Sequence, residues 1–115
     1  MSNANASRAG VTTHAPAAIF AALGDRTRLS LIHRLSDGRS RSIASLSADA
    51  AITRQAVTKH LNVLEEAGLV ASSRIGRESR YSFRPEAIEE IRAYLDEVSR
   101  QWDEALGRLK SFVEG

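Results

Sequence analysis

The stretch TRQAVTKHLNVLEEAGLV, residues 53–70, decides the fold of this chain. Its large aliphatic residues recur at spacings that place them on one face of a helix: Val57, Leu61 and Leu64. Thr53 is a residue type that caps helix starts, and Gly68 stands where a helix-ending glycine belongs. The stretch therefore predicts a helix over residues 54–67 with one buried face.

The opposite face of this helix is polar, and it contains no acid as far as Asn62. No Asp or Glu occurs between Ala50 and Asn62, where a carboxylate would repel DNA. Gln and Asn can pair with adenine, whereas Arg and Lys can pair with guanine or with phosphate. The pattern therefore predicts a helix that reads double-stranded DNA. We expect base contacts from Gln55, Thr58, Lys59 and Asn62, and contacts nearer the backbone from Thr53, Arg54 and His60.

Shorter helices are predicted on the N-terminal side of this stretch. Ser42 is a suitable cap for a helix that runs to Ala50, only a few residues before the next helix. Two helices so joined are typical of a helix-turn-helix, whose second helix enters the major groove. Before them, Pro16 opens one helix and Asp25 caps another over residues 26–36. The apolar faces of these helices are expected to contain Ile19, Phe20, Leu23, Leu29, Ile32, Leu35, Ile43 and Leu46.

From residue 70 the hydrophobic pattern changes to period two. Residues 70–75 and 79–83 alternate in this way and flank the turn residues 76–78, which predicts a β-hairpin. Its basic residues are further candidate DNA contacts: Arg74, Arg77 and Arg80. An arginine at a hairpin tip suits the narrow, negative minor groove, and we expect Arg77 to enter or border that groove.

Pro85 opens a last helix with a heptad pattern of apolar residues. The apolar seam comprises Ile88, Ile91, Leu95, Val98, Trp102, Ala105, Leu109 and Phe112. About 28 residues give about 42 Å of helix, whereas a domain of this size has a radius of gyration of about 13 Å. The helix is longer than its own core can cover. We therefore expect a homodimer whose interface combines this seam with Ile19, Phe20 and Leu23 of the first helix.

Charge is distributed unevenly along the 115 residues. Residues 1–84 hold 12 Lys or Arg and 6 Asp or Glu, whereas residues 85–115 hold 4 and 8. This asymmetry predicts a basic face for an anionic partner. The absence of Cys excludes disulfides and thiolate chemistry, and the three histidines form no metal-binding pattern. Without a catalytic triad or a glycine-rich phosphate loop, we expect no enzyme, no cofactor and no metal.

Length and hydropathy indicate one soluble domain. No apolar run approaches the roughly 18 residues of a membrane span, and the opening residues lack the apolar segment of a secretory signal. We expect a cytoplasmic α+β protein, mainly α. Its domain would cover residues 15–115, with a disordered tail over residues 1–14 and a dimerisation helix over residues 85–113.

Three segments resemble the ArsR-type winged-helix regulators. They are ALGDRTRL at residues 22–29, RQAVTKHL with VLEEAGLV at residues 54–70, and the hairpin at residues 74–83, which looks like the wing of that family. The resemblance covers about residues 16–113. It implies a winged helix-turn-helix and a homodimeric repressor of near-palindromic operators. It also implies dimerisation through the first and last helices, in agreement with the apolar seam.

The metal-sensing residues of that family have no counterpart in this chain. Founding members bind metals through Cys-x-Cys before the reading helix, or through Asp and His on the last helix. The Cys-x-Cys position falls near residues 42–44, which read Ser-Ile-Ala, and the last helix holds no His. The resemblance therefore implies a branch that lacks the metal-ligand motifs.

The sequence thus predicts a sequence-specific DNA-binding transcriptional regulator that represses as a homodimer. Two alternatives remain open. One is a regulator gated by a small molecule bound between the last helix and the core, which would raise the melting temperature and lower DNA affinity. The other is a winged helix that binds a protein instead of DNA, which would show no salt-sensitive DNA binding.

Overall fold

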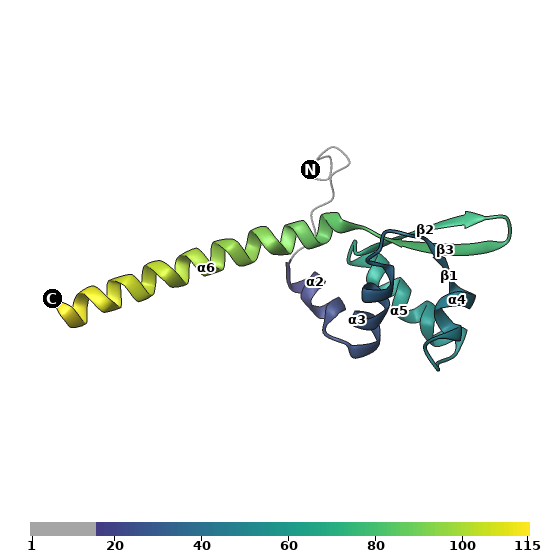
Figure 1. Cartoon of the computed structure of the whole chain (residues 1–115), viewed down its shortest axis with the longest axis horizontal. Helices are drawn as coiled ribbons and strands as arrows, with labels where there is room; N and C mark the ends of the chain where they lie inside the picture. Colours follow the sequence, from purple (N-terminus) through teal and green to yellow (C-terminus); the bar gives the residue numbers. More distant parts are fainter. Residues whose placement is uncertain (1–15) are drawn as a thin grey trace, which may run out of the picture.

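The computed structural model describes residues 16–115, so the tail expected over residues 1–14 lies outside the described residues. A helical body carries a β-hairpin on one side, and a long helix projects from the other (Figure 1). The predicted class, α+β and mainly α, is confirmed. In chain order the elements are α2 (Pro16–Leu23), α3 (Arg26–Leu35), β1 (Arg41–Ser42), α4 (Ile43–Ala48), α5 (Arg54–Glu66), β2 (Val70–Ile75), β3 (Glu78–Phe83) and α6 (Pro85–Glu114).

Polar side chains and a glycine set the helix ends that the sequence predicts. Each cap accepts a hydrogen bond of 3.0 Å from the backbone N–H three residues later: Asp25 for α3, Ser42 for α4 and Thr53 for α5. Gly68, with a φ of 80°, ends α5. Its N–H donates to the Glu65 carbonyl, and the Leu69 N–H donates to the Leu64 carbonyl, which is a Schellman motif. The cap at Gly68 directs the chain from the end of α5 into β2.

The sheet has the strand order β1-β3-β2, and both pairings are antiparallel. β2 and β3 pair as far as Ile75 opposite Glu78, so the turn holds Gly76 and Arg77 and not the predicted residues 76–78. Gly76 has a φ of 63°, which a two-residue hairpin turn favours. The sequence did not predict β1, because a strand of two residues is too short to show a period.

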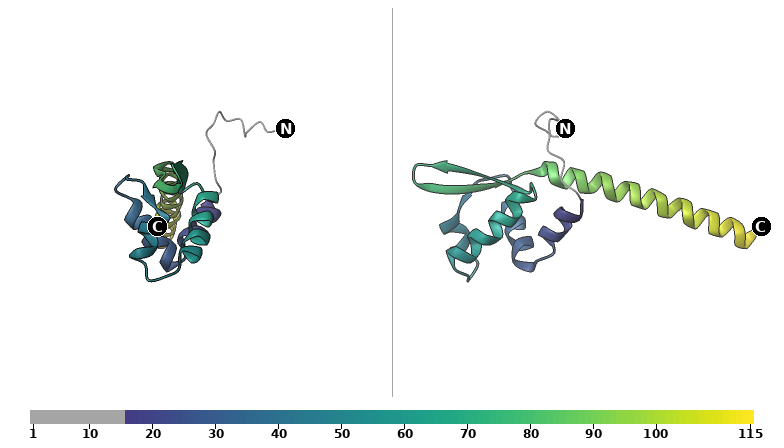
Figure 2. Two further views of the ribbon diagram at one scale, coloured as in Figure 1. Left: turned by 90° about the vertical axis from the view of Figure 1, so that its right-hand side faces the viewer. Right: turned by 180° about the vertical axis from the view of Figure 1, so that it is seen from behind.

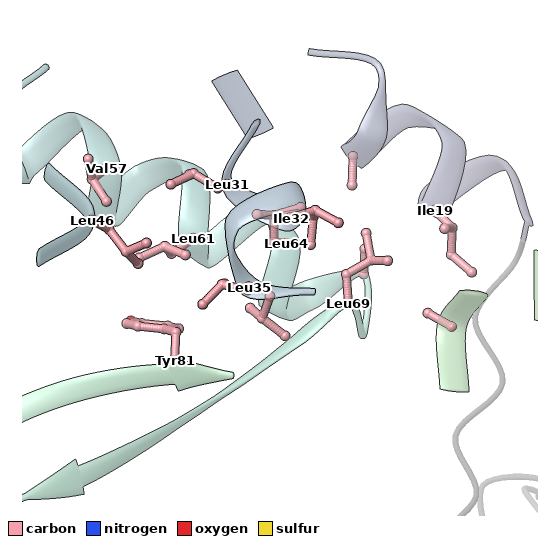
Figure 3. Packing of buried hydrophobic residues seen from close by; sticks show 14 of the residues in the cluster. Ile19, Leu31, Ile32, Leu35, Leu46, Val57, Leu61, Leu64, Leu69 and Tyr81 are labelled. Atoms are coloured by element: carbon pink, nitrogen blue, oxygen red, sulfur yellow. The ribbon is translucent and has the colours of Figure 1, made fainter. Parts of the chain in front are cut away.

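The core lies between the short helices and the sheet (Figure 3). Its largest fully buried side chains are Ile19, Leu31, Leu35, Leu46, Val57, Leu61, Leu64 and Leu69. The predicted stripe of α5 is thus confirmed. Leu29 was wrongly assigned to the core, because it is 53% exposed and Leu31 is buried instead. At about 100° per residue, Leu31 shares a face with Leu35, and Leu29 points away from both.

The connection between α4 and α5 differs from the prediction. α4 ends at Ala48 and not at Ala50. Ala51 then adopts a φ of 56°, in the left-handed region that turns the chain toward the cap of α5. α4, this turn and α5 together form the helix-turn-helix unit of the body (Figure 1).

Most of α6 projects away from the body (Figure 2). Its first turns pack on α2, where Ala87 and Ile91 are buried. The molecule is 68 Å long and its radius of gyration is 18.6 Å, well above the value of about 13 Å for a compact domain of this length. The far half of α6 therefore presents its apolar side chains without cover from residues 16–115.

Candidate nucleic-acid interface

The outer face of α5 is polar because its inner face is anchored in the core. Val57, Leu61 and Leu64 are completely buried, which forces the remaining side chains outward. From residue 54 to residue 62 the exposed residues are Arg54, Gln55, Lys59 and Asn62, and Val63, Glu65 and Glu66 are exposed beyond them. The guanidinium, amide and ammonium groups of the first four are suited to base edges and phosphates. The structure thus brings together on one surface four of the seven residues in and next to α5 that the sequence assigned to DNA.

Two threonines beside this face use part of their hydrogen-bonding capacity within the helix. Thr53 Oγ1 accepts from the Ala56 N–H at 3.0 Å, so the hydroxyl hydrogen remains available to an acceptor such as phosphate. Thr58 Oγ1 donates to the Arg54 carbonyl at 2.8 Å, so its lone pairs remain available to a donor. Thr58 can therefore contact DNA only as an acceptor, whereas Thr53 can still donate.

A groove of about 350 Å³ lies between the start of α4, the outer face of α5 and the hairpin tip. It is lined by Ser42, Ile43, Ala44, Arg54, Thr58, Arg77, Glu78 and Ser79. The sequence offered no signal that Ile43, Ala44 and Ser79 would lie here, because only the packing of the hairpin beside α5 brings them together. Arg54 and Arg77 make two sides of this groove basic.

The three hairpin arginines have different surroundings. Arg74 and Arg77 are exposed. Arg80 is held by the chain before β1: its Nε and Nη2 donate to Ser40 Oγ and to the Ser40 carbonyl, each at 3.0 Å. Its Nη1 donates to Glu78 Oε1 at 2.9 Å. These three donations anchor the hairpin, so we do not include Arg80 among the proposed DNA contacts.

His60 also differs from its expected placement. Its Nδ1 lies 3.3 Å from Arg28 Nη1 and 3.8 Å from Asp25 Oδ2, so the ring faces the start of α3. The side chain is only 25% exposed. These contacts involve Nδ1 and hold the ring against α3, so we do not include His60 in the proposed interface.

The expected dimer residues divide into two groups. Ile19 and Ile91 are buried in the core of their own protomer, so their assignment to an interface is wrong. Leu23 and Ile88 are partly buried against the same core. The first turns of α6 thus use the apolar seam for packing on α2, and only the later turns leave it uncovered.

The uncovered side chains on α2 and α6 form a continuous apolar surface. Its members from the prediction are Phe20, Leu95, Trp102, Leu109 and Phe112, with Val98 half-buried. Three further exposed residues widen it: Tyr94, Leu106 and Val113. The Phe20 and Tyr94 rings meet edge to face at 6.3 Å, which joins the two helices at this surface. We call these nine residues the apolar face of α2 and α6.

A hollow of about 340 Å³ lies along the near half of α6. Its lining residues all belong to that helix: Ile88, Ile91, Arg92, Leu95 and Asp96. The hollow is therefore a depression in the surface of one helix. It does not reach between α6 and the core, which is where the small-molecule alternative places its pocket.

Electrostatic contacts keep several carboxyl groups ionised. A hydrogen bond from the backbone N–H of Arg28, aided by the charge of Arg28, holds the pKa of Asp25 below its usual value. The Arg100 guanidinium, with help from Gln101, lowers the pKa of Glu97 on α6. Burial raises the pKa of the Tyr81 hydroxyl. The two carboxyl groups belong to the cap of α3 and to α6, and not to α5 or the hairpin.

In residues 16–115 no group of three or more His, Cys, Asp or Glu side chains is placed to hold a metal ion. Over the same residues, no helix combines the length and the apolar character needed to cross a membrane.

A short helix, a tight turn, a second helix with a polar outer face and a basic hairpin together define the winged helix-turn-helix class. A family model described as a helix-turn-helix domain matches residues 23–73. The HTH-type transcriptional regulator Rv2034 of Mycobacterium tuberculosis is 34% identical over 90% of this chain and 92% of its own length. YuzN of Bacillus subtilis, also an HTH-type transcriptional regulator, is 41% identical over 64% of this chain and 87% of its own.

A solved structure gives the same result. An ArsR-like transcriptional regulator from Rhodococcus sp. RHA1 superposes with a TM-score of 0.76 at 36% identity, covering 84% of this chain and 91% of that one. This chain belongs to the ArsR-type family of winged helix-turn-helix transcriptional regulators. The resemblance seen in the sequence is thereby confirmed.

Proposed function

We propose that the protein is a homodimeric repressor that binds double-stranded DNA in a sequence-specific manner at a near-palindromic operator. The observation that carries this proposal is the outer face of α5: Arg54, Gln55, Lys59 and Asn62 are exposed together, opposite a fully buried stripe. No carboxylate from residue 51 to residue 61 opposes an approaching phosphate backbone.

The two DNA-facing elements have different tasks. α5 enters the major groove, where the amides of Gln55 and Asn62 meet adenine edges and Lys59 meets guanine or phosphate. The wing lies over the adjacent minor groove, which Arg77 enters or borders. Arg54 and Thr53 lie at the start of α5, where the backbone N–H groups and the helix dipole favour a phosphate.

The second copy of the chain is needed to cover the apolar face of α2 and α6. Trp102 is 63% exposed and Phe112 is 84% exposed, although each is a large apolar side chain. A contiguous surface of this kind marks an interaction site. Two copies joined there would present two α5 helices about 34 Å apart, one turn of B-DNA. Repression follows from occupation of promoter DNA.

Selection of genomic fragments bound by the purified protein tests this function. We expect enrichment of a near-palindrome whose half-sites lie one helical turn apart, with affinity that falls steeply as salt is raised. Gln55→Ala or Asn62→Ala should relax the preference at one base position per half-site. Fragments without a common sequence, or binding that does not respond to salt, would contradict the proposal.

A further inference from the structure

Arg28 joins three helices of the body through one guanidinium group. Its Nε donates to the Ala22 carbonyl at 2.7 Å, and its Nη2 donates to the Ala21 carbonyl at 3.4 Å. Both carbonyls belong to the last turn of α2. Its Nη1 reaches His60 Nδ1 on α5 at 3.3 Å. Arg28 itself lies in the first turn of α3, so the group spans from α2 to the DNA-facing helix.

The chemistry of this contact determines the state of the histidine. A guanidinium group has donors and no acceptor, so His60 Nδ1 must accept. The imidazole is therefore neutral, with its hydrogen on Nε2. A protonated ring carries a hydrogen on both nitrogens and cannot accept from Arg28 at Nδ1. Asp25 Oδ2, 3.8 Å from the same nitrogen, is the group toward which a protonated ring would turn.

Few other charges surround this contact. α2 has no ionisable side chain and offers only carbonyl groups, and α4 has none either. Arg28 and Glu66 line the same hollow between α2 and α5, and Lys59, next to His60 along the chain, is exposed. The ionisable groups in contact with the ring, among residues 16–115, are thus Asp25 and Arg28.

We propose that Arg28 is a positioning residue for DNA reading, which holds α5 to the end of α2 through neutral His60. This inference rests on the proposed function, because it concerns the helix assigned to DNA. α2 carries Phe20 of the apolar face, so the link connects the proposed dimer surface to the DNA-facing helix. Displacement of α2 would move α5 without any change in the side chains that contact DNA.

Arg28→Met tests the link, because it removes the donors and keeps an unbranched apolar side chain. We expect operator affinity to fall by about tenfold, a usual size for coupling between distant sites. The slope of log affinity against log salt should stay unchanged, since no phosphate contact is lost. Arg26→Met removes the same charge from an exposed position of the same helix, and is the matched control for affinity.

His60 variants test the same link without altering the bonds of Arg28 to α2. His60→Gln keeps an acceptor that cannot become charged, and should retain operator affinity. His60→Leu should lose affinity as Arg28→Met does, and the double variant should be no weaker than either single one.

Nitrogen NMR of His60 in the DNA-free protein separates this inference from the function. The hydrogen should reside on Nε2 in the wild type and should redistribute in Arg28→Met. A hydrogen on Nδ1 would overturn the link whether or not DNA binds. A salt slope reduced by about one in Arg28→Met would show that Arg28 contacts phosphate and would also overturn it. If the wild type binds no DNA, the proposed function is refuted. The NMR result then still shows whether Arg28 and His60 are linked.

Discussion

Ala51 shows how a single residue carries the turn of the helix-turn-helix. Within residues 16–115 it is the one residue other than glycine with a positive φ, 56°. The left-handed region costs an L-residue about 1 kcal/mol, because Cβ approaches the carbonyl oxygen. The tight connection between α4 and α5 therefore holds a locally unfavourable conformation that the surrounding packing maintains.

Ala51→Gly should accordingly stabilise the protein by about 0.5–1 kcal/mol in urea unfolding. Glycine has no Cβ to strain at this φ. Ala48→Gly, in the last turn of α4, is the matched control and should destabilise by about the same amount, because it weakens a helix. Equal effects of the two substitutions would show that the φ of residue 51 carries no strain.

Asp25 makes the free energy of unfolding depend on pH in the acidic range. Its pKa in the folded protein is lowered, first by the Arg28 backbone N–H, so the folded state binds its proton less readily than the unfolded state does. The stabilisation is complete above the unfolded pKa and is lost as pH falls through the folded pKa. Asp25→Asn keeps a capping side chain but cannot titrate.

Between pH 5 and pH 2 the melting temperature should therefore fall less steeply for Asp25→Asn than for the wild type. Asp103→Asn removes a carboxylate from the exposed part of α6, where no helix start depends on it, and should follow the wild-type decline. Parallel curves for all three proteins would contradict the assignment of the cap.

Lys59 and Lys110 are the two lysines of the chain and provide a matched pair. Lys59→Ala should weaken DNA binding. If Lys59 meets phosphate, the salt slope falls by about one; if it meets guanine, discrimination at that position falls by about 1–3 kcal/mol. Lys110→Ala, near the end of α6, should change neither quantity in mobility-shift titrations. Equal losses from both would indicate unspecific attraction and not contact by α5.

At the scale of elements, the arginines of the wing differ in their contacts within the protein. Arg77 is exposed at the turn, whereas Arg80 is bonded to Ser40 and Glu78. Both residues lie on the same hairpin and look alike in the sequence. The difference arises because the chain before β1 passes within reach of β3, a contact between residues that are 40 positions apart.

Arg77→Ala should reduce the salt slope of DNA binding by about one and leave the melting temperature unchanged. Arg80→Ala should lower the melting temperature, because Ser40 and Glu78 lose their partner. Circular dichroism and salt titration of the two variants check this division. A lower salt slope for Arg80→Ala with unchanged stability would return Arg80 to the interface.

For the whole molecule, the length of α6 determines where the apolar residues can be buried. Ile88 and Ile91 pack on α2, but α6 continues for some 30 Å beyond the core, by the rise of about 1.5 Å per residue. Large apolar side chains so far from the body gain nothing from their own protomer. Their burial therefore requires another molecule.

Trp102→Glu combined with Leu109→Glu should give folded monomers, because both side chains lie outside the core of the protomer. Charges placed in an interface oppose association. Gly107→Glu with Ser111→Glu alters the polar side of the same helix and should leave the dimer intact. Sedimentation with circular dichroism checks both; a dimer that survives the first pair would show that the apolar face is not the interface.

The periodicity of the sequence was sufficient to predict most helices, the hairpin and the exposed polar side of α5. Buried residues at three- and four-residue spacings select one helix face, and the caps Asp25, Ser42 and Thr53 mark where helices start. These are local properties, because they depend on residues a few positions apart. The seam of α6 was equally evident from its heptad pattern.

Only the tertiary structure decided which apolar residues of these patterns are buried and which polar residues bond within the protein. Ile91 and Phe112 occupy equivalent heptad positions, but Ile91 is buried and Phe112 is exposed. His60 shares a helix with Lys59, but α3 supplies its partners. β1 exists only because β3 pairs with it. Such differences depend on contacts between segments far apart in the chain. A local pattern carries no information about which distant segment will pack against it.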